Sequence, residues 1–247
     1  MGKGILIFLS FFGTANAQLS TNVIYGADDR KDYYQVDPAM AKLADSTVAF
    51  VKASDLQVIG SNSRLRSVPF GQSEALCPSE RFFSQAVAAH CSGFLIAPET
   101  IITAGHCISQ TSVSDCQNAR FIFGFALKTA LEPVWEFPNS EIYSCSRVIH
   151  SVSLNGGEDF AVVKLDRPVT NHQPLTYRSS GAPQVGESLV VMGHPSGLPL
   201  KIAGGAHIRE IKDSYFTANL DTYGGNSGSA VFGADTEILE GVLVRGE

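Results

Sequence analysis

The sequence has no hydrophobic run long enough to cross a membrane and no long apolar stripe at helical spacing. The apolar run at residues 5–12 is much shorter than the roughly 20 residues that a membrane-spanning helix needs. Charged residues make up only 17% of the chain, and the net charge is -6 at pH 7. Because a negative chain is a poor partner for a phosphate backbone, nucleic-acid binding is not expected.

What the chain has instead is a series of short runs rich in Val, Ile and Phe, separated by clusters of Gly, Pro, Asn and Ser. Such runs are typical of strands in an all-β sandwich or barrel. Since 44% of the 247 residues are hydrophobic, the chain can bury an ample core, and we expect one globular all-β unit. The runs cover residues 47–51, 87–96, 100–104, 121–125, 142–149, 160–165, 188–192, 216–220, 230–232 and 238–244.

Residues 1–17 have the order of features that defines a secretory signal peptide. Lys3 precedes the apolar run, and residues 15–17 form a small-x-small cleavage site. Such a peptide directs export and would be removed by cleavage after residue 17, so we expect a secreted or periplasmic protein without stable membrane association. Residues 18–45 carry little apolar periodicity and are interpreted as a leader or N-terminal arm lying on the main body.

The five cysteines include no Cys-x-x-Cys pair. Because this spacing is common in metal-binding and redox sites, its absence argues against both kinds of site, and we expect neither a metal nor a cofactor. In an exported chain the cysteines become candidates for disulfides. A bridge from Cys91 to Cys107 would close a hairpin, whereas the pairing of Cys77, Cys116 and Cys145 stays open.

The most informative stretch is residues 221–232, in which Ser227 stands among glycines. These glycines allow a tight turn, so the amides of Gly225 and Ser227 could point at one spot beside the hydroxyl. A nucleophile with an oxyanion hole needs this arrangement, although surface turns have the same composition. The other serine-hydrolase pattern, Gly-x-Ser-x-Gly between a strand and a helix, does not fit because Ser229 replaces the last glycine.

A serine nucleophile needs a histidine base and a carboxylate that orients the base. No histidine follows Ser227, so the base must lie upstream. His106 is singled out because it ends an apolar run and precedes Cys107, whose bridge to Cys91 would hold its loop. Asp159 directly precedes another apolar run, and a carboxylate shielded from water holds an imidazolium more strongly than an exposed one.

These segments together resemble the catalytic segments of trypsin-like (chymotrypsin-fold) serine proteases. Their order in the chain, histidine then aspartate then serine, is also the order in that family. The resemblance implies two antiparallel β-barrels, the first at about residues 46–170 and the second at about residues 180–247, with the active site in the cleft between them. It covers residues 46–247, and the segments that carry it are residues 92–96, 103–107, 159–165 and 225–229.

In the mechanism that the resemblance implies, Ser227 attacks the scissile carbonyl and forms an acyl-enzyme. His106 transfers the proton, Asp159 orients the imidazole, and the amides of Gly225 and Ser227 hold the oxyanion. We therefore predict a secreted, monomeric serine endopeptidase that acts on protein or peptide substrates. Two alternatives stay open: a serine esterase with the same triad, and a non-catalytic binding protein on the same fold.

Two features resemble the bacterial glutamyl endopeptidase branch of the family. Animal digestive and clotting proteases have an aspartate before the serine, and this aspartate pairs with the new amino terminus after zymogen cleavage. The present chain has Asn226, which cannot form that ion pair. The pattern at residues 224–229, with residues 23–26 and 192–195 upstream, is similar to the bacterial branch. Val23 is then a candidate for the mature N-terminus.

The resemblance further implies that Asp221, Thr222, Val244 and Gly246 belong to the substrate-binding site. Asp221 takes the place where trypsin carries the acid that binds Arg or Lys, so a preference for basic substrates is one hypothesis. The histidine that glutamyl endopeptidases carry in the strand corresponding to residues 241–246 is absent. The residues therefore establish neither a basic nor an acidic preference.

Members of this family normally continue beyond the position at which this sequence stops. The continuation is a strand that completes the specificity pocket and closes the second barrel, followed by a C-terminal helix. We therefore expect the 247 residues to be a fragment or a shortened member, in which a missing tail would hold the partner of the odd cysteine. The alternative is a second barrel that the N-terminal arm closes.

Overall fold

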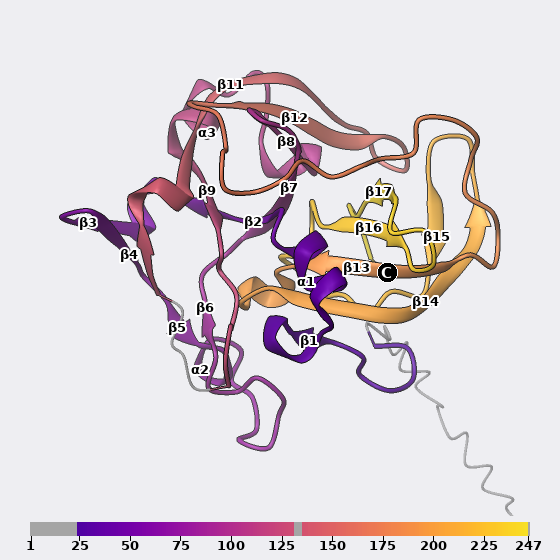
Figure 1. Ribbon diagram of the computed structural model, residues 1–247, viewed down its shortest axis with the longest axis horizontal. Helices are drawn as coiled ribbons and strands as arrows, with labels where there is room; N and C mark the ends of the chain where they lie inside the picture. Colours follow the sequence, from indigo (N-terminus) through magenta and orange to yellow (C-terminus); the bar gives the residue numbers. More distant parts are fainter. Residues whose placement is uncertain (1–23, 131–134, 247) are drawn as a thin grey trace, which may run out of the picture.

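The computed structural model describes residues 24–130 and 135–246. These residues form mainly β-strands, arranged in two halves that lie side by side (Figure 1). The prediction of an all-β chain is therefore confirmed. The expected signal peptide at residues 1–17 and the candidate N-terminus Val23 lie outside the described residues.

The first half is a closed six-stranded barrel in the order β11-β12-β8-β7-β2-β9. Every second residue of β12 is buried, so Ala161, Val163 and Leu165 face the interior. They pack in one apolar core with Phe121 and Phe123 of β9. The strands are β2 (Thr47–Lys52), β7 (Cys91–Ala97), β8 (Thr100–Thr103), β9 (Ala119–Phe123), β11 (Ile142–Ser153) and β12 (Asp159–Leu165).

The second half is a six-stranded sheet in the order β1-β14-β13-β16-β17, with β15 paired to β14. Its described strands do not close into a barrel, because β1 and β17 lie at opposite ends of the order. The strands are β1 (Lys31–Asp32), β13 (Ser188–Gly193), β14 (Lys201–Ile211), β15 (Phe216–Ala218), β16 (Ala230–Gly233) and β17 (Leu239–Val242).

Two strands of this sheet differ from the sequence prediction. β1 belongs to the N-terminal arm and extends the sheet beside β14, far from β17, so the arm does not close a second barrel in the described residues. β14 was not predicted, because Gly204 and Gly205 interrupt its apolar pattern and its second part carries the charged residues Arg209 and Glu210. Both strands become clear only from the pairing with their neighbours.

Small elements cover the edges of the two halves, and all helices in the described residues are short. Helix α1 begins where Asp37 accepts hydrogen bonds from the amides of Ala39 and Met40, directly before Pro38. The remaining strands are β3 (Leu56–Ile59), β4 (Asn62–Leu65), β5 (Val68–Pro69), β6 (Ala86–Val87) and β10 (Glu136–Pro138). The helices are α1 (Pro38–Ala44), α2 (Phe70–Ser73) and α3 (Val113–Asn118), with 3-10 turns η1 (Tyr33–Gln35), η2 (Ala53–Asp55), η3 (Gly105–Cys107), η4 (Asn139–Glu141) and η5 (Pro195–Gly197).

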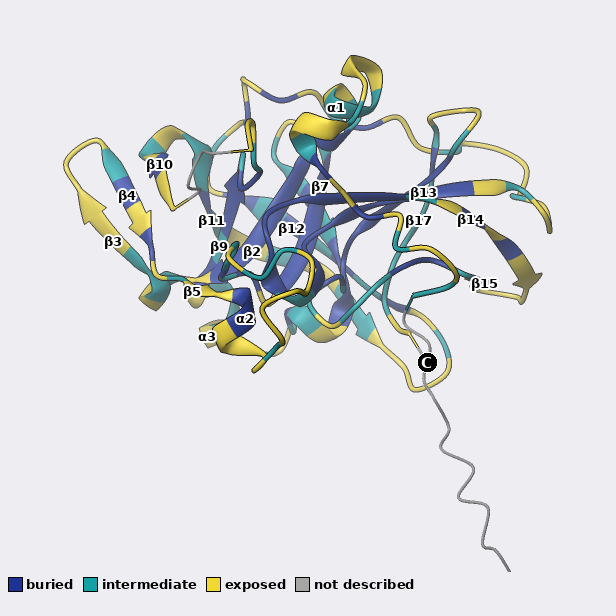
Figure 2. Cartoon of the chain, turned by 90° about the horizontal axis from the view of Figure 1, so that it is seen from below, coloured by how far each residue is buried: buried dark blue, intermediate teal, exposed yellow. Residues whose placement is uncertain are grey.

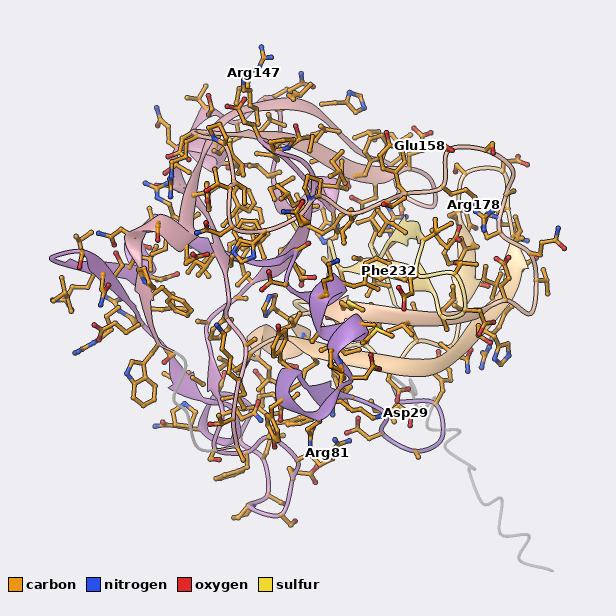
Figure 3. The ribbon with its side chains drawn as sticks, in the orientation of Figure 1. Asp29, Arg81, Arg147, Glu158, Arg178 and Phe232 are labelled. Atoms are coloured by element: carbon orange, nitrogen blue, oxygen red, sulfur yellow. A yellow bond between two sulfur atoms is a disulfide. The ribbon has the colours of Figure 1, made fainter. Side chains whose placement is uncertain are left out.

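The two halves share an apolar core where they meet. Phe94 of β7 packs there with Met192 of β13 and Phe232 of β16, and all three side chains are buried. Phe232 lies toward the middle of the molecule, whereas Arg147 lies at its outer surface (Figure 3). Buried residues are concentrated along β7, β12 and β13, while β3 is largely exposed (Figure 2). This shared core fixes the relative position of the segments that carry the catalytic candidates.

Two disulfides reinforce the first barrel. One joins Cys91 to Cys107, and the other joins Cys116 of α3 to Cys145 of β11. Cys77 is exposed and forms no disulfide with any described residue. Within residues 24–130 and 135–246, no helix has the length and apolar character needed to span a bilayer.

Candidate active site

His106 and Asp159 meet because their strands are neighbours in the first barrel. His106 lies in η3, just after β8, and Asp159 begins β12, which pairs with β8. The His106 backbone amide donates to Asp159 Oδ1 at 3.0 Å, and His106 Nδ1 lies 2.9 Å from Asp159 Oδ2. The Asp159 side chain is only 2% exposed, whereas that of His106 is 40% exposed. The carboxylate is therefore held inside, and the imidazole extends toward solvent.

The charge state of Asp159 follows from these contacts. Burial alone would raise the pKa of Asp159, but hydrogen bonds from His106 and Arg245 outweigh burial and hold this pKa below its ordinary value. The carboxylate is consequently ionised at neutral pH. An ionised, shielded carboxylate is suited to orient an imidazole and to stabilise its protonated form.

The tight turn that presents His106 requires a glycine before it. A Cβ atom at Gly105 would lie 1.9 Å from the carbonyl oxygen of Val152, so any larger residue would displace η3 from β11. After the histidine, Cys107 is tied to Cys91 of β7. The loop is thus fixed on both sides of the imidazole.

The loop with Ser227 is bound to the first barrel by hydrogen bonds to β7. The Ser92 amide donates to the Ser227 carbonyl at 2.7 Å, and Ser92 Oγ donates to the Gly225 carbonyl at 3.1 Å. Gly228 has φ +89°, and a Cβ atom there would lie 2.1 Å from the Ser92 carbonyl oxygen. Sequence reasoning gave Ser92 no role beyond its place in the segment 92–96; a serine at the start of an apolar run was the available signal, and the structure shows that it is fully buried.

The amides of Gly225 and Ser227 do not donate to any acceptor in the described part of the chain. The Gly224 carbonyl accepts from the Ser196 amide at 2.5 Å, and the Asn226 carbonyl accepts from the Ser229 amide at 2.9 Å. In a trans peptide the N–H group points opposite to the carbonyl, so these two bonds set the directions of the Gly225 and Ser227 amides. The turn therefore holds two amides in fixed directions that have no acceptor among the described residues, as an oxyanion site requires.

The nucleophile candidate and the base candidate lie on adjacent segments. Cys107 Sγ is 3.8 Å from the Ser227 carbonyl oxygen, and His106 directly precedes Cys107. Among the described residues no hydrogen bond joins Ser227 Oγ to the imidazole. Catalytic hydrogen bonds in proteins without substrate are often long and tighten only when substrate binds.

Cys91, His106 and Cys107 also form a group of potential metal ligands, whose ligand atoms lie within 4.8 Å of one another. A metal would need thiolate sulfur, but both sulfurs are engaged in the disulfide. The group therefore does not fit a metal ion. Its closeness reflects the disulfide that holds the His106 loop.

The four expected substrate-binding residues have different surroundings. Thr222 and Gly246 are neighbours, since a Cβ atom at Gly246 would lie 3.9 Å from Thr222 Oγ1, and Val244 is partly buried. Asp221 is buried at 4% exposure, and its carboxylate accepts hydrogen bonds from the amides of Tyr25 and Asp29. The structure brings Thr222 and Gly246 together and places Asp221 beneath the N-terminal arm.

Arg245 is a residue near the site that sequence reasoning missed. Its Nη2 donates to Asp159 Oδ2 at 3.1 Å, so this oxygen is shared by Arg245 and His106. The same nitrogen donates to the Leu154 carbonyl. Arg245 lies between two expected substrate-binding residues, Val244 and Gly246, and this position was the available signal. Its contact with Asp159, far away in the sequence, could not be derived from the local residue pattern.

We expect Gly225→Ala to lower turnover by about 100-fold with a much smaller change in KM. Gly225 has φ +88°, and a Cβ atom there would lie 2.8 Å from the His194 carbonyl oxygen, so alanine must displace the amide. That amide would act mainly in the transition state. Steady-state kinetics on a peptide substrate measure the effect, and Gly224→Ala is the matched control because its Cβ atom meets nothing within 4 Å. A raised KM with unchanged turnover would contradict this role.

The comparisons with known proteins give the family of the chain. Residues 91–239 match the family model described as Trypsin-like peptidase domain. A glutamyl endopeptidase from Bacillus licheniformis is 30% identical over 151 residues, which are 58% of this chain and 45% of that protein. Thrombin-like enzyme acutin from Deinagkistrodon acutus is 31% identical over 123 residues, which are 48% of each protein. The chain therefore spans less than half the length of these curated relatives.

Solved structures show the same fold at lower identity. A Glu endopeptidase structure is 20% identical, covers 91% of this chain and 88% of its own, and has a TM-score of 0.54. The VesB protease of Vibrio cholerae is 16% identical, covers 89% of this chain and 60% of its own, and has a TM-score of 0.57. Because the family model matches more than half of the chain, the protein belongs to the trypsin-like peptidase domain family.

Proposed function

We propose that the protein is a serine endopeptidase in which Ser227 is the nucleophile, His106 the base and Asp159 the orienting acid. The observation that carries this proposal is the shielded Asp159 carboxylate, which binds both the backbone and the ring of His106. The amides of Gly225 and Ser227, which have no acceptor within residues 24–130 and 135–246, support it. Membership in the trypsin-like peptidase family supports the same assignment.

In the first step, Ser227 Oγ attacks the carbonyl carbon of the scissile peptide. His106 Nδ1 is engaged by Asp159, so Nε2 is the nitrogen that takes the serine proton. The carbonyl oxygen gains negative charge and accepts hydrogen bonds from the amides of Gly225 and Ser227. The ionised Asp159 stabilises the imidazolium at the same time.

In the second step, the tetrahedral intermediate collapses and the amine leaves with the proton from His106 Nε2. The product is an acyl-enzyme, an ester between Ser227 Oγ and the substrate acyl group. Water then attacks this ester, with His106 as base, and the acid product leaves. Every proton transfer uses one imidazole nitrogen, so the reaction requires no cofactor.

We further propose that the protein is exported and acts on protein or peptide substrates. The two disulfides support an oxidising compartment, where such bonds persist. The name of the Bacillus licheniformis relative supports a peptide substrate. The signal-peptide pattern at residues 1–17 supports export.

Purified protein incubated separately with casein, a small ester and a fluorophosphonate probe tests the proposed function. We expect cleavage of both substrates and labelling at Ser227, because the activated hydroxyl attacks any accessible acyl or phosphonyl centre. Mass spectrometry of the labelled peptide locates the label, and Ser227→Ala is the control. Ester cleavage without casein cleavage would indicate an esterase. No cleavage and no labelling would indicate a binding protein.

A further inference from the structure

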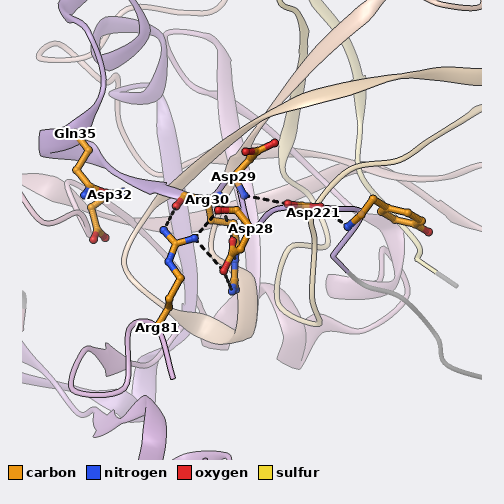
Figure 4. A network of polar contacts seen from close by, with 8 residues as sticks. Asp28, Asp29, Arg30, Asp32, Gln35, Arg81 and Asp221 are labelled. Atoms are coloured by element: carbon orange, nitrogen blue, oxygen red, sulfur yellow. Dashed lines mark hydrogen bonds and ion pairs between the residues drawn. The ribbon is translucent and has the colours of Figure 1, made fainter. Parts of the chain in front are cut away.

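Both carboxylate oxygens of Asp221 accept a hydrogen bond from the backbone of the N-terminal arm. The Tyr25 amide donates to Oδ1 at 2.8 Å, and the Asp29 amide donates to Oδ2 at 3.1 Å (Figure 4). A carboxylate buried at 4% exposure is costly unless its oxygens are hydrogen-bonded, and each oxygen has one such donor. A substrate cation would have to displace the arm to reach this carboxylate.

Residues 24–32, called the arm segment below, are held in place by a second set of contacts. Arg81 donates to the carbonyl oxygens of Asp28 and Arg30, both at 2.6 Å. The Arg30 guanidinium in turn donates two hydrogen bonds to the Asp28 carboxylate, at 2.8 and 2.7 Å. Figure 4 shows that these contacts and those to Asp221 form one continuous cluster. Residues 28–30 are thus held in place by contacts that do not involve Asp221.

The end of the arm segment is bound to the second sheet by a buried ion pair. Asp32 in β1 accepts from Lys201 Nζ at 2.6 Å, and β1 pairs with β14 at this point. Gln85 donates to the Asp32 carboxylate and accepts from Lys201 Nζ. Breaking a buried ion pair by removing one partner is strongly destabilising, so this pair anchors the end of the arm segment to the second sheet.

The arm segment also contacts the start of the turn at residues 223–227, called the oxyanion turn below. The Arg30 guanidinium lies 4.8 Å from the centre of the Tyr223 ring. The Tyr223 carbonyl accepts from the Asn226 amide at 3.1 Å, and this bond forms the turn before Ser227. Residues 221 and 223 are therefore both held by the arm, and the Gly225 amide follows two residues later.

We infer that the arm segment positions the oxyanion turn, and that Asp221 is its docking residue and does not select basic substrates. This inference rests on the proposed peptidase function. The pair of bonds to Asp221 and the Arg30 contact with Tyr223 hold the start of the turn at two points. A turn that is free to move at these points would misplace the amides of Gly225 and Ser227, and a misplacement of about 1 Å can cost about 100-fold in rate.

The test compares Asp221→Asn, Arg81→Met and wild type on peptides with a basic, a neutral or an acidic residue at the cleavage site. Asp221→Asn keeps the shape but removes the second acceptor oxygen. Arg81→Met releases the carbonyls of Asp28 and Arg30 and removes the ion pair with the Asp28 carboxylate. The Arg81 side chain is 44% exposed, so we expect this variant to fold. Asp213→Asn is the matched control, because it makes the same change at an exposed position.

We expect both variants to lose about 10- to 100-fold in turnover on all three peptides, with little change in KM and with slower fluorophosphonate labelling. Asp213→Asn should match wild type. A loss confined to the basic peptide in Asp221→Asn, or wild-type turnover in Arg81→Met, would overturn the inference. If Asp221→Asn does not fold, Arg81→Met decides alone. A wild type that neither cleaves nor becomes labelled would instead refute the proposed function.

Discussion

Replacement of Ser227 by Ala, of His106 by Ala or of Asp159 by Asn is expected to lower kcat for peptide hydrolysis by about 10⁴-fold each. Ser227→Ala removes the nucleophile, and His106→Ala removes the group that takes its proton. Asp159→Asn places an amide where the carboxylate accepts from His106 at 2.9 Å, so the imidazole would adopt the wrong tautomer. Single-turnover and steady-state assays on one peptide substrate measure the three losses.

The three residues act as one unit, so their effects should not add. A Ser227→Ala/His106→Ala double variant is expected to be no slower than the slowest single variant. His207→Ala is the matched control, since His207 is an exposed histidine of β14 outside the site. Far-UV circular dichroism should show all variants folded. Ser227→Ala with most of the wild-type activity would refute the assignment.

Acidification from pH 6.5 to pH 4 is expected to lower the free energy of unfolding by about 3 kcal/mol through His194. His194 is fully buried, and burial lowers its pKa from 6.5 to about 4. The folded-state pKa therefore lies below the unfolded-state pKa, so in this window the unfolded chain binds the extra proton. Stability is retained above pH 6.5 and is lost as the pH falls toward 4.

The pKa of His194 is low because this residue is buried beside the oxyanion turn. Its Nδ1 lies 2.9 Å from the Leu198 carbonyl oxygen, and its ring stacks on Phe125. Its Nε2 is buried and has no partner among the described residues. Protonation would place an uncompensated charge in this apolar environment, which costs far more than the single hydrogen bond returns.

Urea unfolding of wild type and His194→Gln at several pH values between 7 and 4 measures this effect. The variant lacks the titrating group, so its stability should fall less steeply in this window. Activity assays are not needed, because the readout is the free energy of unfolding. Identical slopes for the two proteins would show that His194 does not control acid stability.

The pKa of His172 is shifted in the direction opposite to that of His194. Burial disfavours its charged form, but hydrogen bonds with Asp45 and Glu141, both at 2.7 Å, outweigh burial and raise its pKa above 6.5. Its contribution to stability is complete below pH 6.5 and is lost as the pH rises through the folded-state pKa. In His172→Gln the free energy of unfolding should therefore fall less as the pH rises above 6.5. The fall toward pH 4 should remain, because it depends on His194.

Much of the fold could be predicted from local patterns. The run predicted at residues 47–51 corresponds to β2, and that at residues 160–165 corresponds to β12, because a short apolar run is visible in one segment alone. β14 escaped prediction because its glycines and charged residues interrupt such a run. Its strand character comes from pairing with β13 on one side and with β1 and β15 on the other.

For the site, the sequence by itself determined the residue types and their order: His106 after an apolar run, Asp159 before one, and Ser227 among glycines. These features are local, since each depends on a few adjacent residues. Only the tertiary structure decided which other groups reach them. Arg245 contacts Asp159, and the arm amides occupy Asp221, across sequence separations of 86 and 196 residues. Such contacts depend on how distant strands pair and pack, and no periodicity within a single segment records that choice.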